Sequence, residues 1–178
     1  MRTVVPVADD DRGFFAELAT PFGPVTVVCG ERGVRRIHIG DAGSLDSGEM
    51  HSLVERPRHA EVSTAVRQLR EYLAGRRTAF DLSLDLHGTP FQVAVWRSLA
   101  RVPFGRTSTY AAQARSVGRP RAVRAVGSAN GRNPVPIVLP CHRIIASDGT
   151  LGGYSGGLHV KEWLLGHESG VSGGGGRR

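Results

Sequence analysis

The 178-residue chain has one lysine, two cysteines and no apolar run approaching the ~20 residues that a transmembrane helix needs. No membrane span is therefore expected. Residues 9–11 are three consecutive acids, and no apolar segment typical of a signal peptide accompanies them. The two cysteines, Cys29 and Cys141, do not make a disulfide framework. These absences favour a cytoplasmic protein.

Acidic residues are missing from residues 88–147. Residues 1–86 hold 11 arginines and 13 acids, a net charge of −2, whereas residues 87–178 hold 12 Lys and Arg and 3 acids, a net charge of +9. Such a one-sided basic domain is typical of polyanion binders, because neutralising phosphates releases their counterions. An Arg-rich proteome is the alternative explanation, since Lys161 is the only lysine, but we favour a nucleic acid partner.

The first half has the pattern of a small sheet with one helix. Alternating apolar residues predict strands over 14–20, 24–29 and 34–39, and again a half-buried strand over 80–86. Apolar residues at helical spacing predict a helix over 62–73. Residues 40–58 are rich in Gly, Ser, Asp and Pro and lose this periodicity, which indicates a mobile connection.

The second half opens with helix signals. Thr89-Pro90-Phe91-Gln92 combines an N-cap, a proline at the first helical position and a capping-box glutamine, and predicts a helix that stops near Pro103. Further helices are expected over 110–117 and 120–130, with Gly118 between them. This is a helix-turn-helix pattern, which many all-α domains without DNA also contain.

A nearly continuous apolar run, Val135 to Leu139, predicts a buried strand, followed by a Gly-rich loop over 149–157 and a last helix over 158–167. The Gly-rich tail, 170–178, is expected to be disordered. The predicted fold is α/β. A small N-terminal sheet-plus-helix domain, residues 1–86, precedes a mostly helical domain with a helix-turn-helix, residues 87–169.

The helix expected over 120–130 is narrow and basic. Its small residues are Ala122, Ala125, Gly127 and Ala129. Its cations are Arg121 and Arg124, and Arg119 directly precedes it. Small side chains allow close approach to a DNA groove, but they also allow close packing against a core. The arginines favour the DNA interpretation.

Pro140-Cys141-His142-Arg143 places a thiol beside an imidazole. The thiolate is the nucleophilic form of cysteine, and a cationic or proton-accepting neighbour lowers its pKa. Free cysteines are often inert core residues, so the pair alone does not establish a catalytic site. Consecutive strand residues point to opposite faces, so we expect Cys141 and His142 to communicate through a relay.

Other motifs stand around this pair in a fixed order. They are Phe91-Gln92 with Trp96, Pro103-Phe104-Gly105, Thr109-Tyr110, Arg124 to Asn130, Asn133-Pro134, Tyr154-Ser155-Gly156-Gly157 and Trp163 to Glu168. In order and spacing the motifs resemble those of the O6-alkylguanine-DNA alkyltransferases, which are single-turnover DNA repair proteins. The resemblance covers about residues 89–168, and the N-terminal half is similar only in layout.

The resemblance implies direct-reversal repair, with residues 87–169 as the DNA-binding catalytic domain. O6-alkylguanine, and also O4-alkylthymine, is flipped out of duplex DNA, and its alkyl group passes irreversibly to Cys141. Glu168 would orient His142, which takes the thiol proton through a water molecule, while Asn133 holds the turn that presents the cysteine. The thioether product is not cleaved, so each molecule reacts once and needs no cofactor.

The resemblance also implies contacts with DNA through its minor groove. Arg124 would fill the gap left by the extruded base, and Tyr110 would crowd the neighbouring phosphate and donate to the base. A plain buried tyrosine is the alternative for Tyr110. Further DNA contacts are expected from Arg119, Arg121, Ala125 and Gly127. The substrate pocket is expected to include Pro140, Ser155, Tyr154 and Trp96, with Ser155 and loop amides binding O6.

Three other functions fit parts of the pattern. A cysteine hydrolase could use a Cys-His-Glu relay, but it would leave the basic segment without a role. A damage sensor of related fold would lack the reactive cysteine, and a transcription regulator would need a dimerisation or effector segment. We expect a monomer that binds double-stranded DNA. We expect no bound metal, because Cys29 and His38 do not make a four-ligand zinc set.

Overall fold

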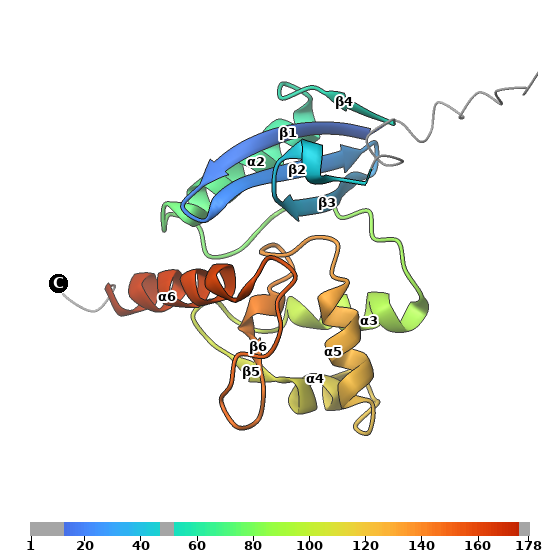
Figure 1. Cartoon of the computed structure of the whole chain (residues 1–178), viewed down its shortest axis with the longest axis vertical. Helices are drawn as coiled ribbons and strands as arrows, with labels where there is room; N and C mark the ends of the chain where they lie inside the picture. The colour runs from blue at the N-terminus through green and yellow to red at the C-terminus, as the bar shows by residue number, and fades with distance from the viewer. Residues whose placement is uncertain (1–12, 47–51, 175–178) are drawn as a thin grey trace, which may run out of the picture.

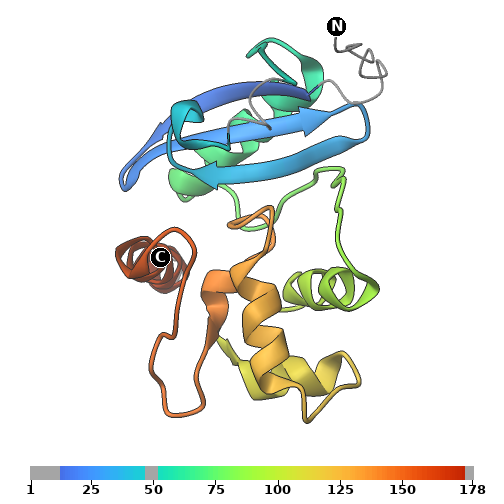
Figure 2. The same ribbon diagram turned by 45° about the vertical axis from the view of Figure 1, so that its right-hand side comes forward.

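The structure, a computed structural model, describes residues 13–46 and 52–174. A sheet packed on one helix forms the N-terminal domain, and a mostly helical domain lies below it (Figure 1). A view turned by 45° shows the same two-part arrangement (Figure 2). The α/β fold predicted from the sequence is confirmed. No helix among the described residues is long and apolar enough to cross a membrane.

The sheet contains β1 (Gly13–Thr20), β2 (Gly23–Gly30), β3 (Gly33–Ile39) and β4 (Leu53–Glu55) in the order β3-β2-β1-β4. β1, β2 and β3 form an antiparallel meander, as their alternating apolar residues predict. β4 pairs in parallel with β1. A bulge interrupts the β2–β3 pairing, because Val28 pairs with Arg36 and Cys29 with Val34.

One helix covers the sheet. α2 (Ala60–Leu73) confirms the helix predicted over 62–73. It turns Val62, Ala65, Leu69 and Tyr72 into the core, where each is at most 1% exposed. The helix therefore buries one apolar stripe, which is the source of its stability in a domain this small.

The connection over 40–58 contains more structure than expected. A 3-10 turn, η2 (Ala42–Ser44), is capped by Asp41, whose carboxylate accepts from Ser44 N at 3.0 Å. β4 lies in the same stretch, along the edge of β1. Ala42 and Leu45 pack with Phe15 and Val28, so burial stabilises a segment whose composition resembles a loop. The expected mobility of residues 47–51 lies outside the described residues.

The prediction of a strand over 80–86 is wrong, because this segment does not pair along its length with another strand. This segment forms only an isolated bridge, Val34 with Leu84, through two backbone hydrogen bonds of 2.9 Å. Phe80, Leu82, Leu84 and Leu86 pack against the core as partly buried residues. Their alternation records burial on one side of an extended chain without a strand ladder.

The mostly helical domain begins with α3 (Pro90–Leu99), which has the predicted capping box between Thr89 and Gln92. β5 (Ser108–Thr109) pairs in parallel with β6 (Ile144–Ile145). Thr109 caps α4 (Tyr110–Ser116). α5 (Val123–Gly131) starts three residues later than predicted, because Arg119–Ala122 form a turn after Gly118, whose φ is +70°.

The buried strand predicted over 135–139 is a turn. Leu139 N donates to Val135 O at 2.9 Å, and Ile137 has a φ of +74°. Pro134, Pro136 and Pro140 have no backbone N–H to give to a strand ladder. The chain enters a 3-10 turn, η3 (Cys141–Arg143), so the strand alternation assumed for Cys141 and His142 does not apply.

The last helix is longer than predicted. α6 runs over Leu158–Gly174, so Glu168 lies inside it and not at its end. The tail expected to be disordered from residue 170 is helical as far as 174, and residues 175–178 lie outside the described part. Val171 lies against Gly75 and Ser172 against Gly105, where even a Cβ atom would collide. These contacts favour the helix despite its glycines.

The two domains share one hydrophobic core. Leu69 and Tyr72 of α2 belong to the same buried cluster as Leu99 and Leu164 of the helical domain. A backbone hydrogen bond of 2.9 Å from Ile37 N to Pro134 O joins the edge strand β3 to the proline-rich turn. The sheet domain is therefore packed directly against the segment that carries Cys141.

Candidate active site

Cys141 lies in a turn that the Asn133 side chain holds together. Asn133 Nδ2 donates to Leu139 O at 2.7 Å and lies 3.2 Å from Cys141 Sγ, and its Oδ1 accepts from Val135 N at 3.1 Å. The cysteine is 5% exposed. Asn133 thus fixes both ends of the turn and contacts the sulfur that the turn presents.

Burial raises the pKa of Cys141 to about 11, although the hydrogen bond from Asn133 and the charge of Lys161 act in the opposite direction. The thiol is therefore protonated near neutral pH and needs a base before it can act as a nucleophile. Cys29, the other cysteine, is fully buried in β2, and burial raises its pKa to about 12.

His142 and Glu168 form a buried pair. His142 Nε2 lies 2.9 Å from Glu168 Oε1, and the two side chains are 0% and 1% exposed. Burial lowers the pKa of His142, against the opposing pull of Glu168. His142 Nδ1 is buried and has no hydrogen-bond partner among the described residues. This nitrogen is available to accept a proton while the other one is held by the carboxylate.

Glu168 receives hydrogen bonds from four residues. Besides His142, Tyr72 Oη donates at 2.7 Å, Gly105 N at 2.9 Å, and the Arg143 guanidinium donates to both oxygens at 2.8–3.1 Å. Burial alone would raise the pKa of Glu168, but the hydrogen bonds from His142 and Arg143 lower it to about 2. The carboxylate is ionised at all physiological pH values.

Sequence reasoning missed three residues of this network. Arg143 stands inside the Pro-Cys-His-Arg motif, and Gly105 ends a motif that was recognised without a role. Tyr72 was predicted only as a core residue of its helix. Only Arg143 left a signal in the sequence, because it directly follows Cys141-His142, and a charged side chain that is buried there needs a partner.

Lys161 is also buried next to the site. Its ammonium is 0% exposed and donates to Ile144 O at 2.6 Å and to Leu151 O. Burial lowers its pKa, and the negative form of Cys141 raises it. This single lysine joins β6 to the Gly-rich loop and places a positive charge within electrostatic reach of the thiol.

A pocket of about 350 Å³ opens onto Cys141. Its lining residues are Tyr110, Gly127, Asn130, Gly131, Cys141, Gly152, Gly153, Tyr154 and Ser155. Two residues expected here are not among them. Trp96 is a core residue whose Nε1 donates to Ala129 O at 2.8 Å, and Pro140 is buried behind the cysteine.

Glycine is required where the Gly-rich loop faces Tyr110. A Cβ at Gly152, whose φ is +67°, would lie 3.0 Å from Tyr110 Oη. Gly127 on α5 faces the other side of the same ring, with 3.8 Å available for a Cβ. Burial raises the pKa of Tyr110, so its hydroxyl keeps its proton and can donate at the pocket.

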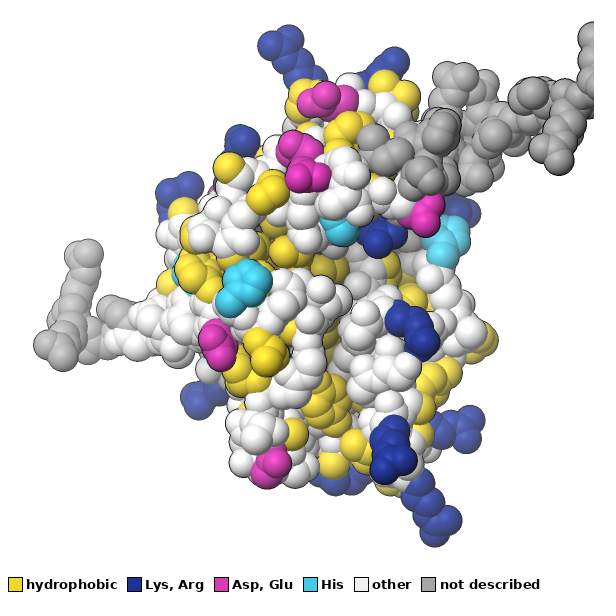
Figure 3. All heavy atoms as spheres, viewed as in Figure 1, with side chains coloured by type: hydrophobic (Ala, Val, Ile, Leu, Met, Phe, Trp, Pro, Cys, Tyr) yellow, Lys and Arg dark blue, Asp and Glu magenta, His cyan; other side chains and the backbone are white. Residues whose placement is uncertain are grey.

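The arginines expected to contact DNA are exposed. Arg124 and Ala125 lie on α5, and Arg119 and Arg121 lie on the turn before it. Over α3, α4 and α5, Figure 3 shows Lys and Arg side chains and no acidic ones. A groove with hydrophobic side chains in its floor runs beside this basic surface.

Comparisons with known proteins match both halves of the chain to one family. Residues 14–86 match the family model of the 6-O-methylguanine DNA methyltransferase, ribonuclease-like domain, and residues 90–170 match that of the 6-O-methylguanine DNA methyltransferase, DNA binding domain. The methylated-DNA–protein-cysteine methyltransferase of Methanosarcina barkeri is 41% identical over 157 residues, covering 85% of this chain and 94% of the relative.

Solved structures give the same result. The crystal structure of Mycobacterium tuberculosis O6-methylguanine methyltransferase has a TM-score of 0.81 and 37% identity, covering 89% of this chain and 94% of that one. The structure of the same organism's protein in complex with DNA has a TM-score of 0.80 with the same coverage. From these matches, which span both domains, we conclude that the chain belongs to the 6-O-methylguanine DNA methyltransferase family.

Proposed function

We propose that this protein repairs alkylated DNA by direct reversal, with Cys141 as the acceptor of the alkyl group. The observation that carries the proposal is a buried cysteine at a pocket, next to a buried His142–Glu168 pair. O6-alkylguanine is the proposed main substrate, and O4-alkylthymine the second one. The reaction ends with a thioether on Cys141, so one molecule repairs one base.

The residues divide the reaction into proton transfer and substitution. His142 Nδ1 accepts the thiol proton through a water molecule, while Glu168 stabilises the imidazolium. The thiolate then attacks the alkyl carbon, a sulfur–carbon bond forms, and the bond from that carbon to O6 breaks. The electron pair stays on the guanine, which takes up a proton from solvent on release.

Donors at the pocket stabilise the charge that develops on the base. Tyr110, with its hydroxyl kept protonated by burial, donates to the base, and Ser155 with amides of the Gly-rich loop binds O6. Because a cysteine that lines a pocket cannot reach an atom inside the duplex stack, the nucleotide must leave the stack to react. In the proposed complex a monomer lies in the minor groove, with Arg124 in place of the extruded base.

The first prediction concerns the acceptor. With duplex DNA labelled at the O6-methyl group, the label should pass to protein in a one-to-one ratio, and mass spectrometry should find one added methyl group on Cys141. Cys141→Ala should abolish transfer and leave DNA affinity close to that of the unsubstituted protein, because the thiol takes part in chemistry and not in binding.

Cys29→Ala is the matched control, because it removes the other buried thiol and should keep stoichiometric transfer. Repeated turnover would instead indicate a hydrolase, and DNA binding without transfer would indicate a sensor or a regulator. Methylation of Cys29 alone would remove Cys141 from its proposed role.

A further inference from the structure

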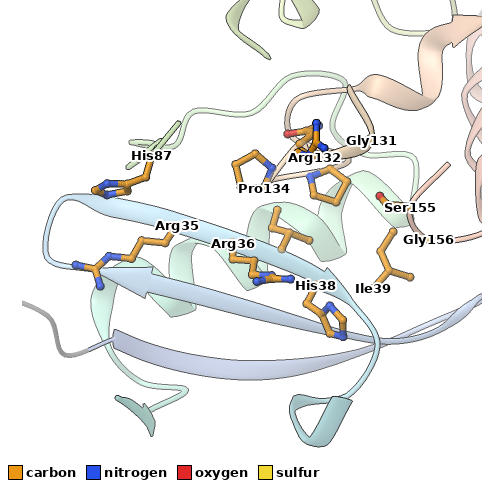
Figure 4. A pocket seen from close by; sticks show the side chains of 13 residues that line it. Arg35, Arg36, His38, Ile39, His87, Gly131, Arg132, Pro134, Ser155 and Gly156 are labelled. Carbon is orange, nitrogen blue, oxygen red and sulfur yellow. The ribbon is translucent and has the colours of Figure 1, made fainter. Parts of the chain in front are cut away.

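A second cavity, of about 580 Å³, lies where the two domains meet. We call it the interdomain cleft, and its charged or titratable lining residues are Arg35, Arg36, His38, His87 and Arg132. Figure 4 shows the side chains of Arg35, Arg36 and His38 from β3 on one side of the cleft. The segment that carries Arg132 and Pro134 lies on the other side. His87 stands at one end and Ser155 at the other.

The cleft is basic. None of its described lining residues is acidic. The carboxylate of Asp85 is shared by Arg32 at 3.3 Å, Arg35 at 3.2 Å and His87 at 3.1 Å. Arg132 donates to the neutral hydroxyl of Ser128 at 2.6 Å and forms no ion pair within the described part of the chain. The described lining of the cleft therefore carries cationic and titratable basic side chains and no carboxylate.

The fold brings these cations together from separate segments. The bulge in β3 adds Arg35 to the strand, and a bulge re-aims the side chains beside it. The Ile37–Pro134 hydrogen bond fixes β3 against the turn after Arg132. Figure 3 shows histidine and Lys or Arg side chains at the level of this boundary, with an acidic side chain beside them.

The interdomain cleft continues the alkyl pocket. Gly131 and Ser155 line both cavities. Arg119, Arg121 and Arg124 lie at the N-terminal end of α5, whereas Arg132 directly follows its C-terminal residue. The nine residues of α5 span about 13 Å at 1.5 Å per residue. Cations are thus placed on both sides of the nucleotide that would enter the pocket.

We infer that the interdomain cleft binds phosphates of the damaged strand on one side of the extruded nucleotide. The inference rests on the proposed repair function, because the strand that delivers a base to the pocket must continue past Gly131 and Ser155. It makes the N-terminal domain part of the DNA interface, through Arg36 on β3, together with Arg132. The bound chemistry is a phosphodiester backbone, recognised by charge and without base contacts.

The test measures how binding depends on salt. In a Cys141→Ala background, which prevents transfer, the affinity for an O6-methylguanine duplex is determined at several salt concentrations. Arg36→Ala combined with Arg132→Ala should lower the slope of log affinity against log salt by about one for each phosphate contact removed. Arg70→Ala with Arg76→Ala removes the same charge at exposed positions outside both cavities, and should leave the slope unchanged.

Shortened duplexes test the position of the contact. Removing the flank that occupies the cleft should reduce the slope of the protein with intact arginines and have no effect on the Arg36→Ala, Arg132→Ala protein. Equal effects of shortening on both proteins would overturn the inference. Equal salt slopes for the cleft variant and the Arg70, Arg76 control would also overturn the inference. This holds even if tripolyphosphate is found to bind to the cleft.

Failure of the cleft and failure of the repair function give different results. Transfer from the free base O6-benzylguanine to Cys141 reports on the alkyl pocket alone, because this substrate has no phosphate. Without transfer from either this base or methylated duplex to the unsubstituted protein, the repair function itself is wrong. If transfer is intact and the Arg36→Ala, Arg132→Ala protein has an unchanged salt slope, only the inference about the cleft is overturned.

Discussion

At the residue scale, Glu168 contacts more than the histidine that it is proposed to orient. Its carboxylate is shared between the imidazole of His142 and the guanidinium of Arg143. A carboxylate facing His142 alone would raise the pKa of that histidine strongly. Here burial disfavours the imidazolium and Arg143 offsets part of the negative charge, so the pKa of His142 is lowered. His142 is therefore neutral near pH 7 and able to accept the thiol proton.

Glu168→Gln should slow alkyl transfer near neutral pH by about 10²–10⁴-fold, the usual contribution of a general base. The amide keeps the shape of the side chain but removes the charge that stabilises protonated His142. The histidine becomes a weaker base and the apparent pKa of Cys141 rises. The rate should then recover in part at higher pH, where hydroxide forms the thiolate. Stopped-flow alkylation of both proteins across pH measures this.

The substitution also leaves Arg143 buried without its carboxylate, and breaking a buried ion pair costs about 3–5 kcal/mol. The rates must therefore be compared at a temperature where circular dichroism shows both proteins folded. Arg143→Lys is a useful companion, because it keeps the positive charge but loses the bidentate contact. An unchanged pH profile for Glu168→Gln would remove Glu168 from the proton relay.

The residues of the relay differ in how far the sequence predicted them. Cys141, His142 and Glu168 carry recognisable motifs, and the structure brings the last two within 2.9 Å across 26 positions. Tyr72 reaches the same carboxylate across 96 positions. Its spacing identified it only as a core residue of α2, because helical periodicity says which face is buried and not what the hydroxyl at its end will meet.

At the element scale, the helices predicted from capping residues begin at those residues. Thr89 and Thr109 each accept a backbone hydrogen bond at the start of a helix, and both helices begin as predicted. The apolar run 135–139 misled for a physical reason, since prolines and the Asn133 side chain turn a segment whose composition alone resembles a strand. Periodicity reports burial, and backbone pairing must be inferred separately.

α5 presents Arg124 at the surface while it buries Val126 and Ala129 in the small core between α3 and α4. Arg124→Ala should slow repair of duplex DNA by at least tenfold and leave reaction with free O6-benzylguanine nearly unchanged. The proposed role of Arg124 is to hold the extruded state of the nucleotide, and a free base has no such state to hold. Single-turnover rates on both substrates make the comparison.

Arg115→Ala is a suitable control, because it removes an exposed arginine from the last turn of α4. It should affect both substrates equally. If Arg124→Ala slowed the duplex and the free base by the same factor, Arg124 would act on the pocket itself and not on extrusion.

At the scale of the whole molecule, the N-terminal domain reaches the relay. Tyr72 of α2 is 0% exposed and donates to Glu168 Oε1, and its carbonyl lies 2.8 Å from His167 Nε2 on α6. Phe80 and Phe104 pack against its ring. The sequence analysis found only the layout of the family in this half, but residues 14–86 match the family model of the ribonuclease-like domain. This sheet domain thus contributes a hydrogen bond to the carboxylate that is proposed to act with His142.

This coupling predicts the effect of Tyr72→Phe. The hydroxyl of Tyr72 stabilises the negative charge of Glu168 and so weakens the pull of that carboxylate on His142. Without it, the pKa of His142 should rise. In the proposed mechanism alkyl transfer needs neutral His142, so the loss of rate on acidification should begin at a higher pH than in the unsubstituted protein. Transfer rates measured from pH 5 to 8 locate this change.

Val66→Ala separates this effect from a loss of stability. Val66 also lies on the buried face of α2, but it makes no contact with Glu168 in the hydrogen-bond network. Both substitutions should lower the urea midpoint of unfolding, because Val66→Ala removes buried methyl groups and Tyr72→Phe removes a buried hydrogen bond. Only Tyr72→Phe should move the acid limb of the rate profile. An equal movement in both variants would mean that domain packing in general, and not the tyrosine hydroxyl, sets the basicity of the relay.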